Sequence, residues 1–156
     1  MKQTLKSVIS FITISVFFIF SGCSKNADTV TNFTKTQLLT NSDWVQTGSQ
    51  SKLTTESVWT DNFSSTPACS KDDRLVFRAN GSFEINEGPT KCNSSNPQIL
   101  LTGTWSFAQN ETELVATIGG QNQTLTIETL TTTLLVIKYT DSYSGITREY
   151  KETYSH

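Results

Sequence analysis

The stretch "RLVFRANGSFEINE" at residues 74–87 decides the fold of this chain. Apolar and polar side chains alternate on both sides of Asn80-Gly81, so that Phe77 and Phe83 each lie on the apolar face of their strand. A period of two residues is typical of strands with one buried face. Asn-Gly is the strongest short signal for a two-residue hairpin turn, because both turn positions require a positive φ. The stretch therefore predicts an antiparallel hairpin of residues 74–80 and 82–87.

The same alternation continues outward from this hairpin in both directions. Further strands are predicted at residues 44–51, 100–109, 113–120, 123–129, 133–140 and 146–154. Their spacing and short turns are typical of an all-β barrel, and closure of the barrel removes exposed strand edges. We therefore predict an all-β fold, an eight-stranded antiparallel up-and-down barrel over residues 37–156. A single helical turn at residues 36–43 is expected to pack Leu38 and Leu39 under one end of it.

The first 22 residues are typical of a bacterial lipoprotein signal helix. Lys2 and Lys6 precede an apolar run at residues 8–20, which is shorter than the roughly 17–25 residues that span a bilayer. Phe-Ser-Gly-Cys at 20–23 then resembles a lipobox, in which the cysteine is acylated and becomes the new N-terminus; the alternative is a short anchor helix. We expect Cys23 to carry the lipid and residues 23–36 to form a tether. The protein would then be an outer-membrane lipoprotein of the cell envelope, periplasmic or surface-exposed.

The remaining cysteines are Cys69 and Cys92. In an exported chain an even number of cysteines is typical of disulfides. A redox pair is more often closely spaced, and a metal site would need more ligands, whereas the only histidine is His156. A disulfide would join the two longer predicted connections, residues 52–73 and 88–99.

Residues 68–107, "ACSKDDRLVFRANGSFEINEGPTKCNSSNPQILLTGTWSF", carry a family resemblance. The shared pattern consists of Cys69, Asp72, Asp73, Asn80, Gly81, Glu87, Gly88, Cys92, Gly103, Thr104, Trp105 and Ser106. It resembles the lipocalin-like domain lipoproteins of Bacteroidota-type bacteria, and "LLTNSDW" at 38–44 is similar to the start of their first strand. The resemblance covers roughly residues 37–156. It implies a lipocalin-like barrel and a Cys69–Cys92 disulfide, and it implies no particular ligand.

Five aromatic residues of the predicted strands are candidate ligand-binding residues: Trp44, Phe77, Phe83, Trp105 and Phe107. An eight-stranded barrel is just wide enough either to be filled by side chains or to hold one small ligand. We expect a lipid-anchored protein that binds a small hydrophobic ligand. The alternative is a surface interaction module with a solid core, which grips a protein or glycan through its loops. An exposed patch containing Trp59 or Phe63 would favour that alternative.

Other function classes fit the sequence less well. A net charge of −2 without a basic stripe argues against nucleic-acid binding. His156 at the C-terminus is poorly placed for a catalytic triad, and no phosphate loop or zinc spacing occurs. Asp72 and Asp73, with Glu84 and Glu87 nearby, could form an acid pair or a calcium site, but neighbouring strand residues point to opposite faces. We therefore predict a non-enzymatic protein without a metal or cofactor, in which these carboxylates are structural.

Overall fold

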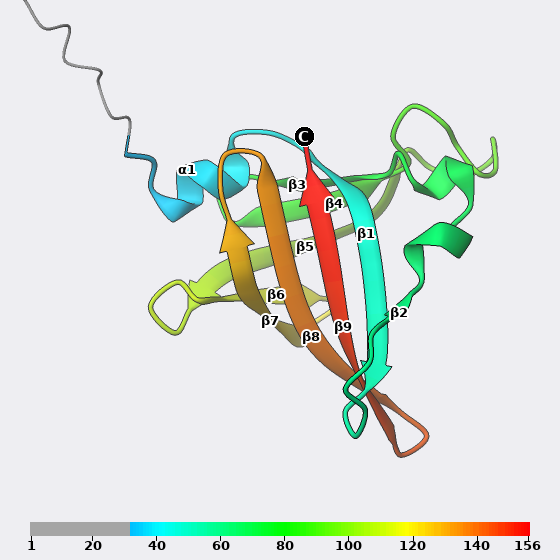
Figure 1. The fold of residues 1–156 in the computed structure, drawn as a ribbon. Coiled ribbons are helices and arrows are strands. Elements are labelled where there is room, and N and C mark those ends of the chain that lie inside the picture. The colour runs from blue at the N-terminus through cyan, green and yellow to red at the C-terminus, as the bar shows by residue number, and fades with distance from the viewer. Residues whose placement is uncertain (1–31) are drawn as a thin grey trace, which may run out of the picture. The chain divides into compact units, whose positions relative to one another are not determined.

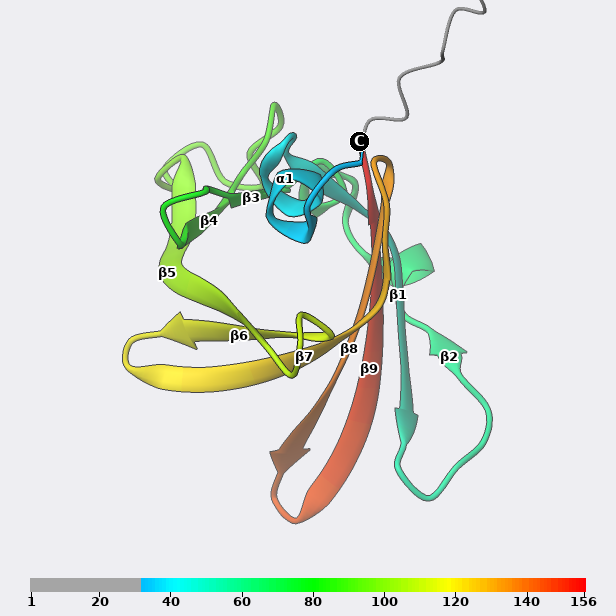
Figure 2. The ribbon, with the colours of Figure 1, turned by 90° about the vertical axis from the view of Figure 1, so that its left-hand side faces the viewer.

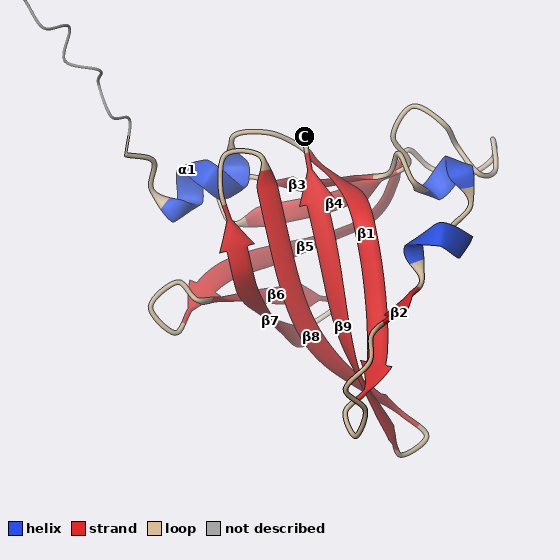
Figure 3. Ribbon diagram, in the orientation of Figure 1, coloured by secondary structure: helices blue, strands red, loops and turns tan. Residues whose placement is uncertain are grey.

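The computed structural model describes residues 32–156 and confirms the predicted eight-stranded antiparallel barrel (Figures 1 and 3). The barrel strands are β1 (Trp44–Leu53), β3 (Arg74–Phe77), β4 (Ser82–Asn86), β5 (Ile99–Ala108), β6 (Glu113–Ile118), β7 (Gln121–Leu130), β8 (Leu134–Tyr143) and β9 (Ile146–Ser155). They pair in this order, and the pairing of β9 with β1 closes the ring. Figure 2 shows the strands following one another around the ring, with α1 at the near end. A short strand that the sequence did not predict, β2 (Thr60–Asp61), pairs with β1 outside the ring.

The predicted hairpin joins β3 to β4 through Ala79, Asn80 and Gly81, of which only Gly81 has a positive φ, and this turn also holds β5. Gly81 has a φ of +83°, a conformation that suits glycine. The backbone amide of Trp105 donates to the Gly81 carbonyl at 2.7 Å. The Trp105 indole N–H lies 3.1 Å from the carbonyl oxygens of both Arg78 and Ser82. The turn and this tryptophan, which are 24 residues apart, therefore form one hydrogen-bonded unit.

Gly88 and Gly103, both within residues 68–107, allow neighbouring segments of the chain to approach closely. A Cβ atom on Gly103 would lie 2.5 Å from the Phe83 ring and from the Thr117 carbonyl oxygen. A Cβ atom on Gly88, whose φ is +58°, would lie 2.0 Å from the Asp72 carbonyl oxygen. Real side chains do not fit at such distances, so these positions require glycine.

Helix α1 (Lys35–Thr40) packs at one end of the barrel, where the sequence predicted a helical turn. Thr34 and Gln37 form a capping box at its N-terminus. Leu39 has no solvent exposure, and its carbonyl oxygen accepts a hydrogen bond from the Trp44 indole at 2.9 Å. The helix begins at Lys35, so the expected domain boundary at residue 37 falls inside it.

The Cys69–Cys92 disulfide is present, with a Cα–Cα distance of 5.1 Å. It joins the 3₁₀ turn η2 (Ala68–Ser70), which follows η1 (Phe63–Ser65), to the connection between β4 and β5. The buried Glu87 carboxylate orders the same connection, because it accepts hydrogen bonds from the Cys92 amide at 3.0 Å and the Asn96 side chain at 2.7 Å. Closing a loop of about 24 residues stabilises a domain by roughly 3 kcal/mol.

Residues 32–156 form one compact unit that contains every barrel strand, the whole core cluster and the disulfide. This segment therefore holds all the contacts that define the barrel, as expected of a domain that can fold by itself. The predicted signal helix at 1–22, Cys23 and most of the tether lie outside the described residues. Within residues 32–156, no helix is both long and apolar enough to cross a bilayer.

Candidate ligand cavity in the barrel

The interior of the barrel contains a cavity of about 420 Å³. This volume falls within the range of pockets that bind small molecules, about 300–1,000 Å³. Ten of its lining residues are apolar: Leu75, Phe77, Phe83, Ile85, Trp105, Leu114, Ala116, Ile118, Leu125 and Ile137. The other five are polar: Gln46, Gln123, Tyr139, Glu152 and Tyr154. The lining therefore combines a large apolar surface with a few polar groups, as in known ligand sites.

The structure divides the five predicted aromatic residues between the cavity and the solid core. Phe77, Phe83 and Trp105 line the cavity. Trp44 does not, because it is fully buried at the α1 end, with its ring centroid 4.0 Å from that of His156. Phe107 also lies away from the cavity and supports it from behind, edge-on to Trp105 at a centroid distance of 5.3 Å. The barrel interior is thus solid near α1 and hollow further along.

The cavity reaches the surface where β7 and β8 separate. These strands pair only from Thr126–Lys138 to Leu130–Leu135, although both continue beyond. Figure 2 shows the β6–β7 and β8–β9 hairpins diverging from this point. Gln123 spans the gap, because its side-chain amide lies 3.4 Å from the Thr140 carbonyl oxygen. Ile118, which lines the cavity and is 38% exposed, lies at the outer edge of the β6–β7 hairpin.

Glu152 of β9 supplies a buried carboxyl group to the cavity wall, with only 7% exposure. One carboxylate oxygen accepts a hydrogen bond from the Gln46 side-chain amide, and the other lies 3.1 Å from the Ser49 hydroxyl. Burial raises the pKa of Glu152, and the two hydrogen bonds oppose this rise because they favour the ionised form. The cavity therefore contains one titratable carboxyl group that is held in a fixed position by neutral donors.

Two tyrosines complete the polar part of the wall. Burial, reinforced by the nearby Glu152 charge, raises the pKa of Tyr139 to about 12 and raises the pKa of Tyr154 still further. Tyr139 is stacked on Tyr150, with ring centroids 5.0 Å apart. Both Tyr139 and Tyr154 are therefore neutral at physiological pH and contribute hydroxyl groups rather than charge.

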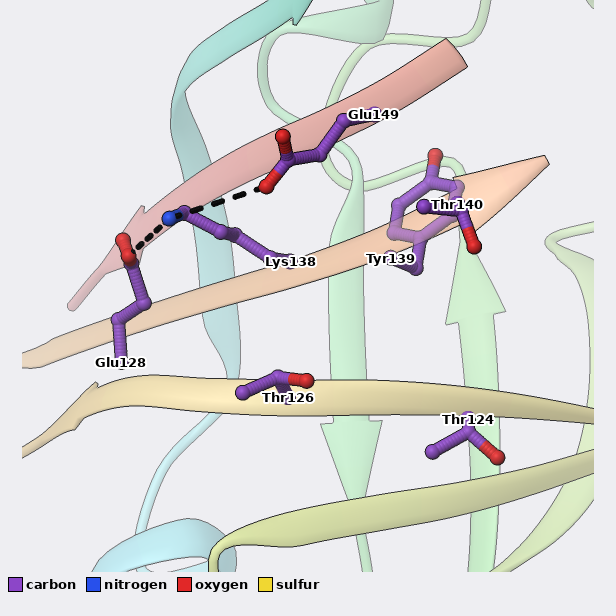
Figure 4. A pocket seen from close by; sticks show the side chains of 7 residues that line it. All are labelled: Thr124, Thr126, Glu128, Lys138, Tyr139, Thr140 and Glu149. Carbon is purple, nitrogen blue, oxygen red and sulfur yellow. Dashed lines mark ion pairs between the residues drawn. The ribbon is translucent and has the colours of Figure 1, made fainter. Parts of the chain in front are cut away.

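A second hollow of about 410 Å³ lies on the outer face of β7, β8 and β9 (Figure 4). Lys138 lies between two carboxylates there, paired with Glu128 and 3.9 Å from Glu149. Thr124, Thr126 and Thr140 line the rest, and Tyr139 borders both hollows. The charged side chains of this outer groove are paired with one another or, for Glu149, with Lys52, and they are partly exposed to water. The groove is therefore a less specific candidate than the inner cavity.

The loop aromatics do not form the exposed patch that would favour an interaction module. Trp59 is half-buried beside the lysines of the outer wall, with its ring centroid 5.1 Å from the Lys52 Nζ and 4.9 Å from the Lys151 Nζ. Phe63 is likewise half-buried, with the Lys71 Nζ 4.8 Å from its ring centroid. These contacts are cation–π interactions within the barrel and its own loops.

Asp72, Asp73 and Glu87 lie around the close contact at Gly88. Burial raises the pKa of Asp73, and the charges of Glu87 and Asp72 add to this effect. Glu84 points elsewhere and pairs with Arg78 at 3.0 Å. Among residues 32–156, no three potential ligands are placed to hold a metal ion. Asp72, Asp73 and Glu87 thus lie near one another without forming a metal site in the described part of the chain, and Glu84 lies apart from them.

Sequence reasoning missed the polar residues of the cavity, Glu152 above all. On β9, Tyr150, Glu152 and Tyr154 alternate with Glu149, Lys151 and Thr153. Both faces of this strand are rich in polar atoms, so the pattern does not show which face is buried. Only the pairing of Glu152 with Ser49 and Ile137 reveals that it faces inward.

No protein-family model matches the sequence, and no curated protein matches it. The resemblance to lipocalin-like lipoproteins therefore stays a prediction from the motifs. The functional argument rests on the geometry of the cavity.

Proposed function

We propose that this protein binds a small, largely apolar ligand inside its barrel and is held in the cell envelope by a lipid on Cys23. The observation that carries the binding proposal is the cavity of about 420 Å³. A barrel of eight strands can be filled completely by its side chains. In this chain the core cluster fills the barrel around Leu39 and Trp44, and its members Phe77, Phe83 and Trp105 border the space that remains.

The lining favours binding over catalysis. Phe77, Phe83 and Trp105 offer a large apolar contact surface, which gives affinity through burial without directing a reaction. Glu152 is the one carboxylate among the lining residues in the described part of the chain. Glycoside hydrolysis, the carboxylate chemistry considered above, uses two such groups about 5–10 Å apart. We therefore propose a carrier or receptor for a small molecule.

Filling the cavity tests the binding proposal. Ala116 is 8% exposed and lines the cavity, so in Ala116→Phe the ring would occupy the space of the ligand. The reporter is N-phenyl-1-naphthylamine, a neutral apolar dye that fluoresces in apolar surroundings, added to the segment 32–156. We expect the wild type to bind the dye, Ala116→Phe to lose at least tenfold in affinity, and the control Ala79→Leu, at an exposed turn position, to bind normally. Native mass spectrometry after exposure to a bacterial lipid extract should show a bound molecule. A wild-type segment that stays empty in both measurements would contradict the proposal.

The lipid anchor is tested separately in cells. Lipoproteins with two or more acyl chains are held firmly by a membrane, whereas a protein without them is not. Replacing Cys23 with serine in the full chain should move the protein from the membrane fraction to the soluble fraction. A Cys23→Ser protein that stays in the membrane fraction with its signal removed would overturn this part of the proposal.

A further inference from the structure

The buried carboxyl group of Glu152 has no positively charged partner in the described part of the chain. Its only side-chain hydrogen bonds come from Gln46 and Ser49, which are neutral. The ion pairs formed within residues 32–156 involve other carboxylates. Buried charges in proteins are usually paired, because an unpaired charge loses the solvation that water gives it. The Glu152 carboxyl group, which lines the cavity at 7% exposure, is therefore a position at which a positively charged group of a ligand can bind.

Strand alternation explains why the protein supplies no cation to this carboxyl group. Lys52 on β1, Lys138 on β8 and Lys151 on β9 all lie around Trp59 on the outer wall. Glu152 belongs to the opposite face of the same sheet, because its neighbour Lys151 points outward. The barrel thus places lysines outside and one carboxyl group inside.

The other titratable groups around Glu152 do not change this picture. Tyr139 on β8 and Tyr154 on β9 have raised pKa values and stay neutral, and Tyr150 is stacked on Tyr139. From β1 the groups that face Glu152 are Gln46 and Ser49. On β3, Arg74 is directed to Asp43, at 3.7 Å. Glu152 is the one group in the cavity whose charge changes between acidic and neutral pH.

We propose that the cavity selects amphipathic ligands with one protonated amine, whose ammonium group pairs with Glu152 while the apolar part contacts Phe77, Phe83 and Trp105. This inference rests on the proposed binding function and names its ligand class. An ammonium group carries several N–H donors, so it can donate to the Glu152 carboxylate and to a tyrosine hydroxyl at the same time. The aromatic walls add to the attraction, because their faces attract cations. A fatty acid fits less well, because its carboxylate would meet a like charge.

Three ligands with the same ten-carbon chain test this selection: 1-aminodecane, 1-decanol and decanoate. Each competes with N-phenyl-1-naphthylamine for the segment 32–156 at pH 7.5. We expect the amine to displace the dye at about tenfold lower concentration than the alcohol, and decanoate to be the weakest of the three. In Glu152→Gln, which keeps the shape of the side chain and removes its charge, the amine should lose its advantage over the alcohol. In the matched control Glu149→Gln, on the outer face of the same strand, the advantage should remain.

A pH series on the wild type supplies a second measurement that needs no variant. The amine prefers ionised Glu152, so its advantage over decanol should shrink as the pH falls through the raised pKa of this carboxyl group. If the dye and decanol bind but the amine has no advantage at any pH, the inference is overturned and the binding function stands. The same holds if Glu152→Gln keeps the advantage. If neither the dye nor any of the three ligands binds, the proposed function itself fails, and this inference with it.

Discussion

The two ends of the barrel are built from similar side chains but packed differently. At the α1 end, Leu39, Trp44 and Leu135 have no solvent exposure and fill the space between the strands. Toward the other end, a cavity of about 420 Å³ begins beside Phe77, Phe83 and Trp105 and extends to Ile118 and Gln123, near the β6–β7 turn. The first arrangement is the close packing that stabilises domains, and the second gives up part of that packing. The comparison shows how one small barrel separates stability from binding, which are often in conflict at one site.

Two features keep the second end open. β7 and β8 stop pairing at Thr126–Lys138, so the wall cannot draw together beyond that point. Glu152 adds a group that cannot be covered by apolar side chains without losing its solvation. Collapse of the cavity would thus require new strand pairing and would bring apolar side chains against the already buried Glu152 carboxyl group.

Replacing one leucine with alanine in each region should give the largest difference in the free energy of unfolding. Leu135 at the solid end is fully buried, so Leu135→Ala should lower the free energy of unfolding by about 2–5 kcal/mol. Leu125 lines the cavity and already lacks neighbours on one side. Leu125→Ala should therefore lower the free energy of unfolding by less than about half the amount expected for Leu135→Ala. Guanidinium unfolding of both variants, followed by circular dichroism, measures the difference. Equal losses would mean that the cavity wall is as tightly packed as the core, and the comparison would fail.

Removing the disulfide tests whether the stability of the two ends can be separated. Cys69→Ser combined with Cys92→Ser should lower the free energy of unfolding by roughly 3 kcal/mol. The connections that it joins lie on the side of the barrel away from α1 (Figure 1). We expect hydrogen exchange to increase mainly in residues 62–73 and 87–98, while α1 and its neighbours in β1 and β7 stay protected. A uniform loss of protection across the barrel would show that both ends unfold as one unit.

The sequence predicted the solid end better than the hollow one, for physical reasons. Alternation and the Asn80-Gly81 turn predict strands and their inner faces, and the helical turn expected at residues 36–43 predicted the packing of Leu39 at the solid end. A cavity depends on how β7 and β8 diverge, which the local pattern does not encode. Glu152 occupies an inner position but has the composition of a surface residue, so the sequence pattern hid it.

The extra strand β2 was missed for a similar reason. It consists of Thr60 and Asp61, both exposed, and pairs with Gln50 and Ser51 of β1. A strand of two polar residues shows no alternation in the sequence. Its pairing forms only because the loop after β1 folds back along that strand. The sequence predicted the same role for all five aromatic residues, and the packing alone decides that Trp105 lines the cavity whereas Trp44 and Phe107 do not.

The smallest expected effect compares two glutamates of β9, one on each face of the wall. Glu149 pairs with Lys52 at 3.1 Å and lies 3.9 Å from Lys138, so Glu149→Gln should lower the free energy of unfolding at neutral pH by less than about 1 kcal/mol. Glu152 has a raised pKa in the folded state because of burial, so its ionised form opposes folding. Glu152→Gln should therefore raise the melting temperature at neutral pH, the opposite sign to Glu149→Gln.

The pH dependence of the Glu152 effect follows from proton linkage. Between the unfolded-state value of 4.5 and the raised folded pKa, the folded state binds more protons than the unfolded state. The stability of the wild type relative to Glu152→Gln therefore falls as the pH rises through this window and is constant above it. Below pH 4.5 both proteins carry a neutral group at this position, and their melting temperatures should converge. Melting curves from pH 4 to pH 8 measure this. A Glu152→Gln protein that is less stable than the wild type at pH 8 would show that the carboxylate already has a stabilising partner, and the hollow end would then be complete without a ligand.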